Sequence, residues 1–156
     1  MADSLNIRKA EKKDVPELFR IEQRCFDAES FSRRQINYLV SRSKGEFLVL
    51  TENDNIAGFL ILLQRRNSPG VRIYSLAVSP NYRGKQYAKQ LVLKADQVVK
   101  YLSKRFLHLE VSEANFSAIQ LYRKLGFQIT GKRGRYYKDG SDAWLMRLGV
   151  NPSKLS

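Results

Sequence analysis

Apolar positions along the first half of the chain change their period several times, and each change predicts a separate element. Residues 5–10 alternate apolar and polar side chains, which is the pattern of a strand. Apolar side chains at helical spacing then predict one helix over 15–26 and a second, short helix from Ser32. The apolar runs 47–50 and 56–63 flank a short polar turn, as in a β-hairpin.

The second half of the chain predicts further strands separated by helices. The strands are expected at 71–78, 106–111, 127–130 and 143–150. The helices are expected at 88–102 and 115–124. Because a strand, a helix and another strand follow one another, at least one pair of strands must run parallel. The sequence therefore predicts a mixed α/β sheet flanked by helices, in a single domain that spans residues 1–156.

Two residue types that carry much of protein chemistry are scarce. The chain has 156 residues, with one cysteine, Cys25, and one histidine, His108. An internal disulfide and a cysteine/histidine metal cluster are therefore both excluded, and no metal is expected. We expect Cys25 to be a buried thiol on the first helix and His108 to be structural.

Targeting and membrane segments are not recognisable in the sequence. Residues 1–10 lack the apolar stretch of a secretory signal. The longest apolar run, 56–63, is far too short to span a bilayer. These features predict a soluble, cytoplasmic protein with no membrane partner.

Positive charge is concentrated in the second half of the chain. The net charge is +13, and residues 1–70 carry 12 Lys and Arg against 10 Asp and Glu. Residues 71–156 carry 16 Lys and Arg against 5 Asp and Glu. Such a field attracts anions, which include nucleic acid, anionic lipid and phosphorylated cofactors, and the charge alone does not choose among them.

A basic turn between the strand 71–78 and the long helix is the first segment with candidate chemistry. The chain passes from Leu76 through the basic residues Arg83 and Lys85 into a helix near Ala88. Free amides of a first helical turn point in one direction, and the helix dipole adds positive potential there. The turn is therefore suited to a pyrophosphate, although a plain strand–turn–helix with solvated charges has the same sequence pattern.

Residues 107–127 are the second such segment. Asn115 and Tyr122 are seven residues apart, about two helical turns, so they share one helix face. A phenol on that face could donate a proton to a departing thiolate, or could simply be a half-buried core tyrosine. Glu110 stands late in an apolar strand, where a carboxylate is costly unless it is used or paired. It is a candidate general base, with an ion pair to Arg or Lys as the alternative.

Both segments resemble motifs of the GNAT superfamily of N-acetyltransferases. Arg83 and Ala88 match the first and last positions of its acetyl-CoA pyrophosphate loop, Gln/Arg-x-x-Gly-x-Gly/Ala. Gln86 replaces the usual glycine, and it carries backbone strain if that position needs a positive φ. The run from Asn115 to Phe127 resembles the later motif Asn-x-x-Ala-x-x-Leu-Tyr-x-Lys-x-Gly-Phe. The resemblance implies the GNAT fold, a mixed and mostly antiparallel sheet with a central parallel pair that splays at the cofactor site.

Site residues follow from this resemblance position by position. It implies Glu110 as general base and Tyr122 as general acid, with acetyl-CoA as co-substrate. The residues that it implies for cofactor binding are Leu76, Ala77, Val78, Arg83, Gly84, Lys85, Gln86, Tyr87, Ala88, Asn115 and Lys124. An acceptor pocket is expected between a loop at 27–32, with Phe31, and the segment 131–142, with Tyr136 and Tyr137.

The positions of Glu110, Asn115 and Tyr122 are similar to those of the RimI-like subgroup, which acetylates protein N-terminal α-amines. An α-amine has a pKa of about 7.7–8.0, against about 10.4 for lysine, so one base deprotonates it more easily. We therefore expect direct acetyl transfer to a protein or peptide N-terminus, with a ribosome or ribosomal protein as a candidate partner. The alternatives are a GNAT enzyme that acts on a small amine or a lysine side chain, and a non-catalytic module that binds CoA or RNA.

Overall fold

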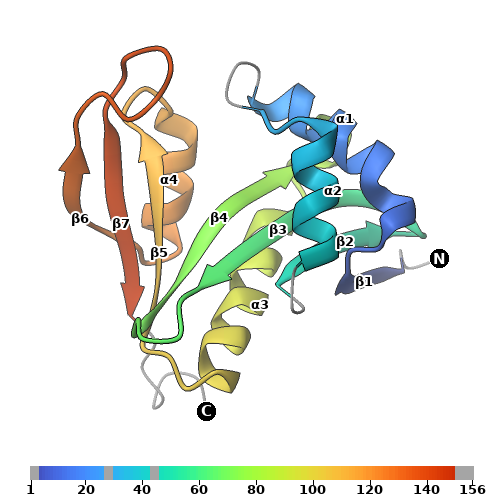
Figure 1. Ribbon diagram of the computed structural model, residues 1–156, viewed down its shortest axis with the longest axis horizontal. Helices are drawn as coiled ribbons and strands as arrows, with labels where there is room; N and C mark the ends of the chain where they lie inside the picture. Colours follow the sequence, from blue (N-terminus) through green and yellow to red (C-terminus); the bar gives the residue numbers. More distant parts are fainter. Residues whose placement is uncertain (1–3, 27–29, 43–45, 150–156) are drawn as a thin grey trace. The chain divides into compact units, whose positions relative to one another are not determined.

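The computed structural model describes residues 4–26, 30–42 and 46–149 (Figure 1). Its strands are β1 (Leu5–Lys9), β2 (Phe47–Glu52), β3 (Asn55–Gln64), β4 (Gly70–Val78), β5 (Phe106–Ser112), β6 (Gln128–Arg133) and β7 (Ala143–Gly149). Its α-helices are α1 (Val15–Phe26), α2 (Arg33–Arg42), α3 (Tyr87–Tyr101) and α4 (Phe116–Lys124). Short 3-10 helices, η1 (Lys12–Asp14) and η3 (Pro80–Tyr82), precede α1 and α3.

The strands form a mixed sheet with the order β1-β2-β3-β4-β5-β7-β6. The pairs β1–β2, β2–β3, β5–β7 and β6–β7 run antiparallel. β4 and β5 run parallel, and Gly70–Arg72 of β4 pair with Phe106–His108 of β5. The predicted mixed, mostly antiparallel sheet with a parallel pair is therefore confirmed.

By its internal contacts the chain divides into two compact units. The first contains the described residues up to Leu62 together with Ser75–Val92, and the second contains Leu63–Tyr74 and the described residues from Leu93 onward. β4 and α3 each contribute residues to both units. The two units are described separately below.

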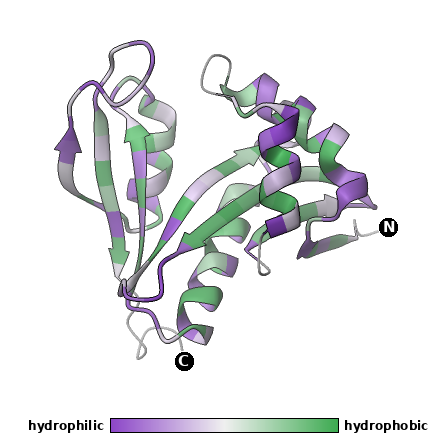
Figure 2. Cartoon of the chain, in the orientation of Figure 1, coloured by the Kyte–Doolittle hydropathy of each residue, from purple (hydrophilic) through white to green (hydrophobic). Residues whose placement is uncertain are grey.

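The first unit has its core between its strands and the helices α1 and α2. Strand residues such as Val49 and Leu60 and helix residues such as Leu18 and Ile36 are at most 1% exposed. Figure 2 shows the corresponding hydrophobic stretches of β2 and β3. The expected hairpin between β2 and β3 is present. Asn53 and Asp54 at its tip have φ of 51° and 68°, a conformation that these two residue types tolerate well.

Gly58 on β3 leaves no room for a side chain. A Cβ atom at this position would lie 2.6 Å from the carbonyl oxygen of Ala77. Because that oxygen belongs to the backbone, the strand itself must move. We therefore expect Gly58→Ala to lower the free energy of unfolding by roughly 1–3 kcal/mol in urea denaturation. Gly149→Ala is the control, since a Cβ there meets nothing within 4 Å. Equal stability of the two variants would contradict this reading.

The second unit is built on β5, whose side chains alternate between two environments. Leu107, Leu109 and Val111 are buried, at most 6% exposed, whereas His108 and Glu110 point to the opposite, half-buried face. β7 pairs with β5 along its length, so Glu110 lies opposite Leu145.

The predicted end of β6 is wrong, whereas the predicted end of α4 is confirmed. β6 extends to Arg133, three residues beyond the predicted strand 127–130, so the first part of the segment 131–142 is strand. α4 ends at Lys124 as predicted, and Gly126 follows it with a φ of 102°, a conformation that commonly ends helices. Residue 150, placed in the last predicted strand, and residues 27–29 of the predicted loop lie outside the described residues.

Membrane-spanning helices were also not expected. Within residues 4–26, 30–42 and 46–149, no helix combines the length and the apolar character that a membrane crossing needs.

Candidate functional site

The basic turn that precedes α3 contains two residues in the left-handed conformation. Gly84 and Gln86 have φ of 84° and 63°, and the carbonyl of Gln86 accepts the first helical hydrogen bond, from Gln90 at 3.2 Å. A positive φ at a non-glycine residue costs about 1–2 kcal/mol. Position 86 therefore does need the left-handed conformation, and Gln86 carries the strain that its departure from the motif predicted. A Cβ at Gly84 would meet nothing within 4 Å, so the turn is open on that side.

Arg83 folds back onto the end of β4. Its Nε donates to the carbonyl of Val78 at 3.3 Å, and its Nη2 lies 3.6 Å from the Sγ of Cys25. Burial raises the pKa of the Cys25 thiol, although Arg83 opposes the shift. The thiol is thus neutral near pH 7. Cys25 is half-buried, and not fully buried as predicted.

Glu52, at the end of β2, anchors the same turn and was not identified from the sequence. The Nζ of Lys85 lies 2.8 Å from its Oε1, and the Tyr87 hydroxyl donates to the same oxygen. These two hydrogen bonds hold the pKa of Glu52 below its ordinary value. Lys85 is therefore partly neutralised by a carboxylate, and the Tyr87 side chain, 4% exposed, is used inside the protein.

The other predicted cofactor-binding residues of this unit lie at the end of β4 and in the first turn of α3. Leu76, Ala77 and Val78 form the end of β4, and Ala77 is 4% exposed. Ala88 lies in the first turn of α3 and is half-buried. Their role in cofactor binding stays a prediction.

In the second unit, Arg72 connects the candidate base to one of the candidate acceptor residues. Its Nε donates to Oε2 of Glu110 at 2.9 Å, and its Nη2 donates to the hydroxyl of Tyr136 at 2.9 Å. The guanidinium also lies 5.1 Å from the ring centroid of Tyr74. Tyr136 in turn meets Tyr137 edge to face, with ring centroids 4.9 Å apart. The structure thus brings Glu110, Tyr136 and Tyr137 into one cluster.

Sequence reasoning missed Arg72, because only the register of two strands brings it close to Glu110. The parallel register places Arg72 opposite His108, two residues before Glu110 and on the same face of β5. The alternative ion pair of Glu110 is therefore present, with Arg72, and the Glu110 side chain is 10% exposed. The role of Glu110 as a base stays a prediction. Burial lowers the pKa of His108, so this neighbour is neutral near pH 7.

Helix α4 carries the remaining candidates of this unit. Asn115 caps the helix, since its Oδ1 accepts from the amide of Ala118 at 3.2 Å. Tyr122 is 8% exposed and meets Phe127 edge to face at 5.4 Å. Burial raises the pKa of Tyr122 to about 12, so its hydroxyl keeps its proton at neutral pH and can donate. Lys124 is exposed in the last turn.

Phe31, the predicted acceptor residue of the first unit, is held by a buried carboxylate. Its amide donates to Oε1 of Glu22 at 3.1 Å. Glu22 is 1% exposed, and its Oε2 has no hydrogen-bond partner among the described residues. Burial raises the pKa of Glu22 to about 7, and the hydrogen bond from Phe31 opposes the shift. Glu22 was visible in the sequence only as the polar exception on an apolar helix face.

This carboxylate predicts a pH dependence of stability. Because the folded pKa is about 7 and the ordinary value is 4.5, the stabilising contribution is complete below 4.5 and is lost as the pH rises through about 7. We expect Glu22→Gln to unfold like the parent near pH 4 and to be more stable at pH 8, by up to about 3 kcal/mol. Urea denaturation at both pH values measures this. The exposed Glu17→Gln is the control, and a difference that does not change with pH would count against the assignment.

Metal ligands do not cluster in the described part of the chain. No group of three or more His, Cys, Asp and Glu side chains there could hold a metal ion.

Comparison with known proteins identifies the family. Residues 13–127 match the model of the Acetyltransferase (GNAT) family. RimI of Mycobacterium tuberculosis, an N-alpha-acetyltransferase, is 34% identical over 76 residues, which is 48% of this chain and 46% of that protein.

Two solved structures resemble the chain along nearly its whole length. Ard1 from Thermoplasma volcanium superimposes with a TM-score of 0.86 and 26% identity, over 94% of this chain and 98% of that one. The ribosomal-protein-S18-alanine N-acetyltransferase from Escherichia coli has a TM-score of 0.80 and 28% identity, over 95% of each chain. The family match covers most of the chain and confirms the predicted acetyl-CoA-dependent acetyltransferase: the chain belongs to the GNAT family.

Proposed function

We propose that this enzyme transfers the acetyl group of acetyl-CoA directly to the α-amine of a protein N-terminus. The observation that carries the proposal is the cluster in which Arg72 joins the Glu110 carboxylate to the Tyr136 hydroxyl, at 2.9 Å in each case. It supplies a proton acceptor next to an aromatic wall. The names of the relatives support the acceptor class. RimI is described as an N-alpha-acetyltransferase, and the Escherichia coli enzyme is described as a ribosomal-protein-S18-alanine N-acetyltransferase.

The basic turn fits the pyrophosphate of acetyl-CoA. It offers amides at the start of α3, the helix dipole and the cations Arg83 and Lys85, beside open space at Gly84. Lys85 is shared with Glu52, so binding of a phosphate would compete with that ion pair. Asn115 and Lys124 are the candidates from α4. When bound, acetyl-CoA supplies the activated thioester.

The chain's own residues then move protons. Glu110 accepts a proton from the ammonium group, and the neutral amine attacks the thioester carbonyl. A new C–N bond forms, the C–S bond breaks, and the sulfur leaves with the proton that Tyr122 donates. The nitrogen then gives up its second proton, which restores the Tyr122 hydroxyl, and Glu110 releases its proton to solvent. The products are the acetylated amine and the free thiol of CoA. Tyr122 suits the donor role because it is protonated at neutral pH.

An α-amine suits a site with a single carboxylate base. With a pKa of about 7.7–8.0, roughly a tenth of α-amines are already neutral near pH 7, against well under a thousandth of lysine side chains. Tyr136 and Tyr137 provide flat surfaces for a peptide, and Phe31 is the candidate from the first unit. A ribosomal protein is the partner that the Escherichia coli relative suggests.

Thiol release from acetyl-CoA tests the proposal. The acceptor panel contains short peptides with free N-termini, the same peptides with blocked N-termini, spermidine and free lysine. We expect turnover with free N-termini and none with blocked peptides that lack lysine. Turnover with spermidine alone would show that the acceptor is a small amine and that the proposal is wrong.

A further inference from the structure

The outer face of α2 carries cations and an exposed aromatic ring. Ile36 and Val40 are buried on the inner face, at 1% and 8% exposure. Arg34, Tyr38 and Arg42 follow one another at intervals of four residues, so they form a stripe along the other side of the helix. α2 contains three arginines and neither aspartate nor glutamate.

Tyr38 presents an exposed aromatic ring on this face. Its side chain is 59% exposed, although the guanidinium carbon of Arg42 lies 5.5 Å from its ring centroid. An aromatic ring flanked by arginines on a helix surface is a platform on which a nucleobase can stack. Neither the core nor the acetyl-transfer chemistry uses this ring.

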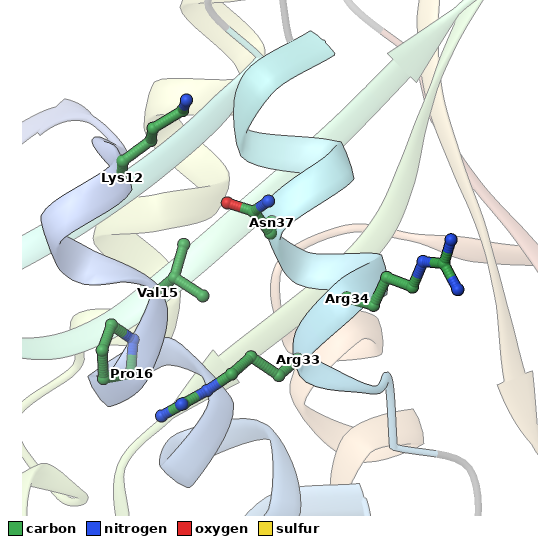
Figure 3. Close-up of a pocket in the computed structure, with 6 residues that line it drawn as sticks. All are labelled: Lys12, Val15, Pro16, Arg33, Arg34 and Asn37. Atoms are coloured by element: carbon green, nitrogen blue, oxygen red, sulfur yellow. The ribbon is translucent and has the colours of Figure 1, made fainter.

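A basic pocket lies at the N-terminal end of the same helix (Figure 3). It has a volume of about 590 Å³, and it opens between the first turns of α1 and α2. Its lining residues are Lys12, Val15, Pro16, Arg33, Arg34 and Asn37. Two helices begin at this pocket, so both dipoles add positive potential to that of the three cations.

The acidic groups Asp14 of η1 and Glu17 of α1 pair with other cations. Asp14 pairs with Arg8 at 2.8 Å, Glu11 with Lys13 at 3.4 Å, and Glu17 with Arg20 at 3.0 Å. Among the residues that the structure describes, Lys12 and Arg34 have no acidic partner. Arg33 lies over the ring of Phe19, 5.6 Å from its centroid. The pocket therefore keeps its positive charge and suits an anion.

We propose that this face of α2 binds single-stranded RNA, with a phosphate in the pocket and a base stacked on Tyr38. Cations that hold the backbone and an exposed ring that takes a base are the two components of sequence-tolerant single-strand binding. An acidic peptide would use the cations and leave Tyr38 without a role. The inference is independent of the proposed acetyl transfer, because it uses none of the residues assigned to it.

Fluorescence anisotropy with a labelled single-stranded RNA of mixed sequence, titrated at several salt concentrations, tests this surface. We expect Tyr38→Ala to weaken binding about 5-fold to 150-fold, the range for loss of one stacked base. We expect Arg34→Gln to weaken binding and to reduce the slope of log affinity against log salt by about one. Tyr38→Phe, which keeps the ring, should bind like the parent.

Controls separate this face from the general positive charge of the chain. Arg20→Gln removes the same charge from a residue already paired with Glu17, and we expect RNA binding within about twofold of the parent. Acetylation of a free peptide should be unchanged in Tyr38→Ala. RNA affinity equal to the parent in both Tyr38→Ala and Arg34→Gln would overturn the proposal. So would an Arg34-dependent complex with a polyglutamate peptide that forms when RNA does not bind.

Discussion

Replacing Glu110 with Gln is expected to lower kcat/KM for acetylation of a peptide N-terminus about 100-fold to 10,000-fold near pH 7, the usual worth of a general base. The amide has nearly the shape of the carboxylate and can still accept a hydrogen bond from Arg72, which lies 2.9 Å from Oε2 of Glu110. The substitution removes the proton acceptor and leaves the fold largely intact. Steady-state kinetics with one free N-terminal peptide measures the loss.

The pH dependence separates a base from a structural ion pair. An α-amine deprotonates by itself as the pH passes about 8, so the deficit of Glu110→Gln should shrink between pH 7 and pH 9.5. Glu113→Gln is the matched control, because Glu113 pairs with Lys132 at 3.4 Å and no step is assigned to it. We expect its kcat/KM within about threefold of the parent. A Glu110→Gln enzyme with normal turnover and a lowered melting temperature would show that Glu110 is only the partner of Arg72.

Replacing Tyr122 with Phe is expected to lower kcat about 100-fold or more, with little change in KM for the peptide. The ring and its edge-to-face contact with Phe127 at 5.4 Å are kept, so packing is preserved. Only the hydroxyl is lost, and its pKa of about 12 makes it a donor throughout the neutral range. The leaving sulfur then departs without a proton donor.

A better leaving group should rescue this variant. An acetyl thioester with a more acidic thiol needs less help from a donor, so the deficit of Tyr122→Phe should be smaller with it than with acetyl-CoA. Tyr101→Phe makes the same chemical change at a side chain that is 89% exposed, and its kinetics should match the parent. An equal deficit with both thioesters would mean that Tyr122 does not act on the leaving group.

Local sequence patterns predicted most of the fold because each element carries its own signals. The hairpin tip at Asn53 and Asp54 and the glycine after α4 need backbone conformations that few residues adopt. Strand β6 was predicted too short for a physical reason. β6 is an edge strand of the sheet, and Lys132 and Arg133 at its end are exposed. Apolar and polar residues therefore do not alternate there in the sequence.

The candidate site was predictable only where a motif is contiguous. The basic turn and α4 each lie in one stretch of sequence, and both are formed as expected. Arg72 is 38 residues from Glu110, and Glu52 is 33 residues from Lys85, so only the register of the strands brings these pairs together. The positive charge on helix α2 was also not predictable from the sequence. Residues 1–70 carry nearly balanced charge, so the sequence does not mark α2 as basic. In the structure, Glu11 and Glu17 pair with Lys13 and Arg20 and not with the arginines of α2.

The position of the acetyl group on a peptide with one free α-amine and one internal lysine tests the central claim most directly. Tandem mass spectrometry of the product, made with acetyl-CoA near pH 7, locates it. We predict acetylation of the α-amine, with the lysine unmodified, and loss of this product in Glu110→Gln. Acetylation of the lysine side chain with a free α-amine would contradict the account.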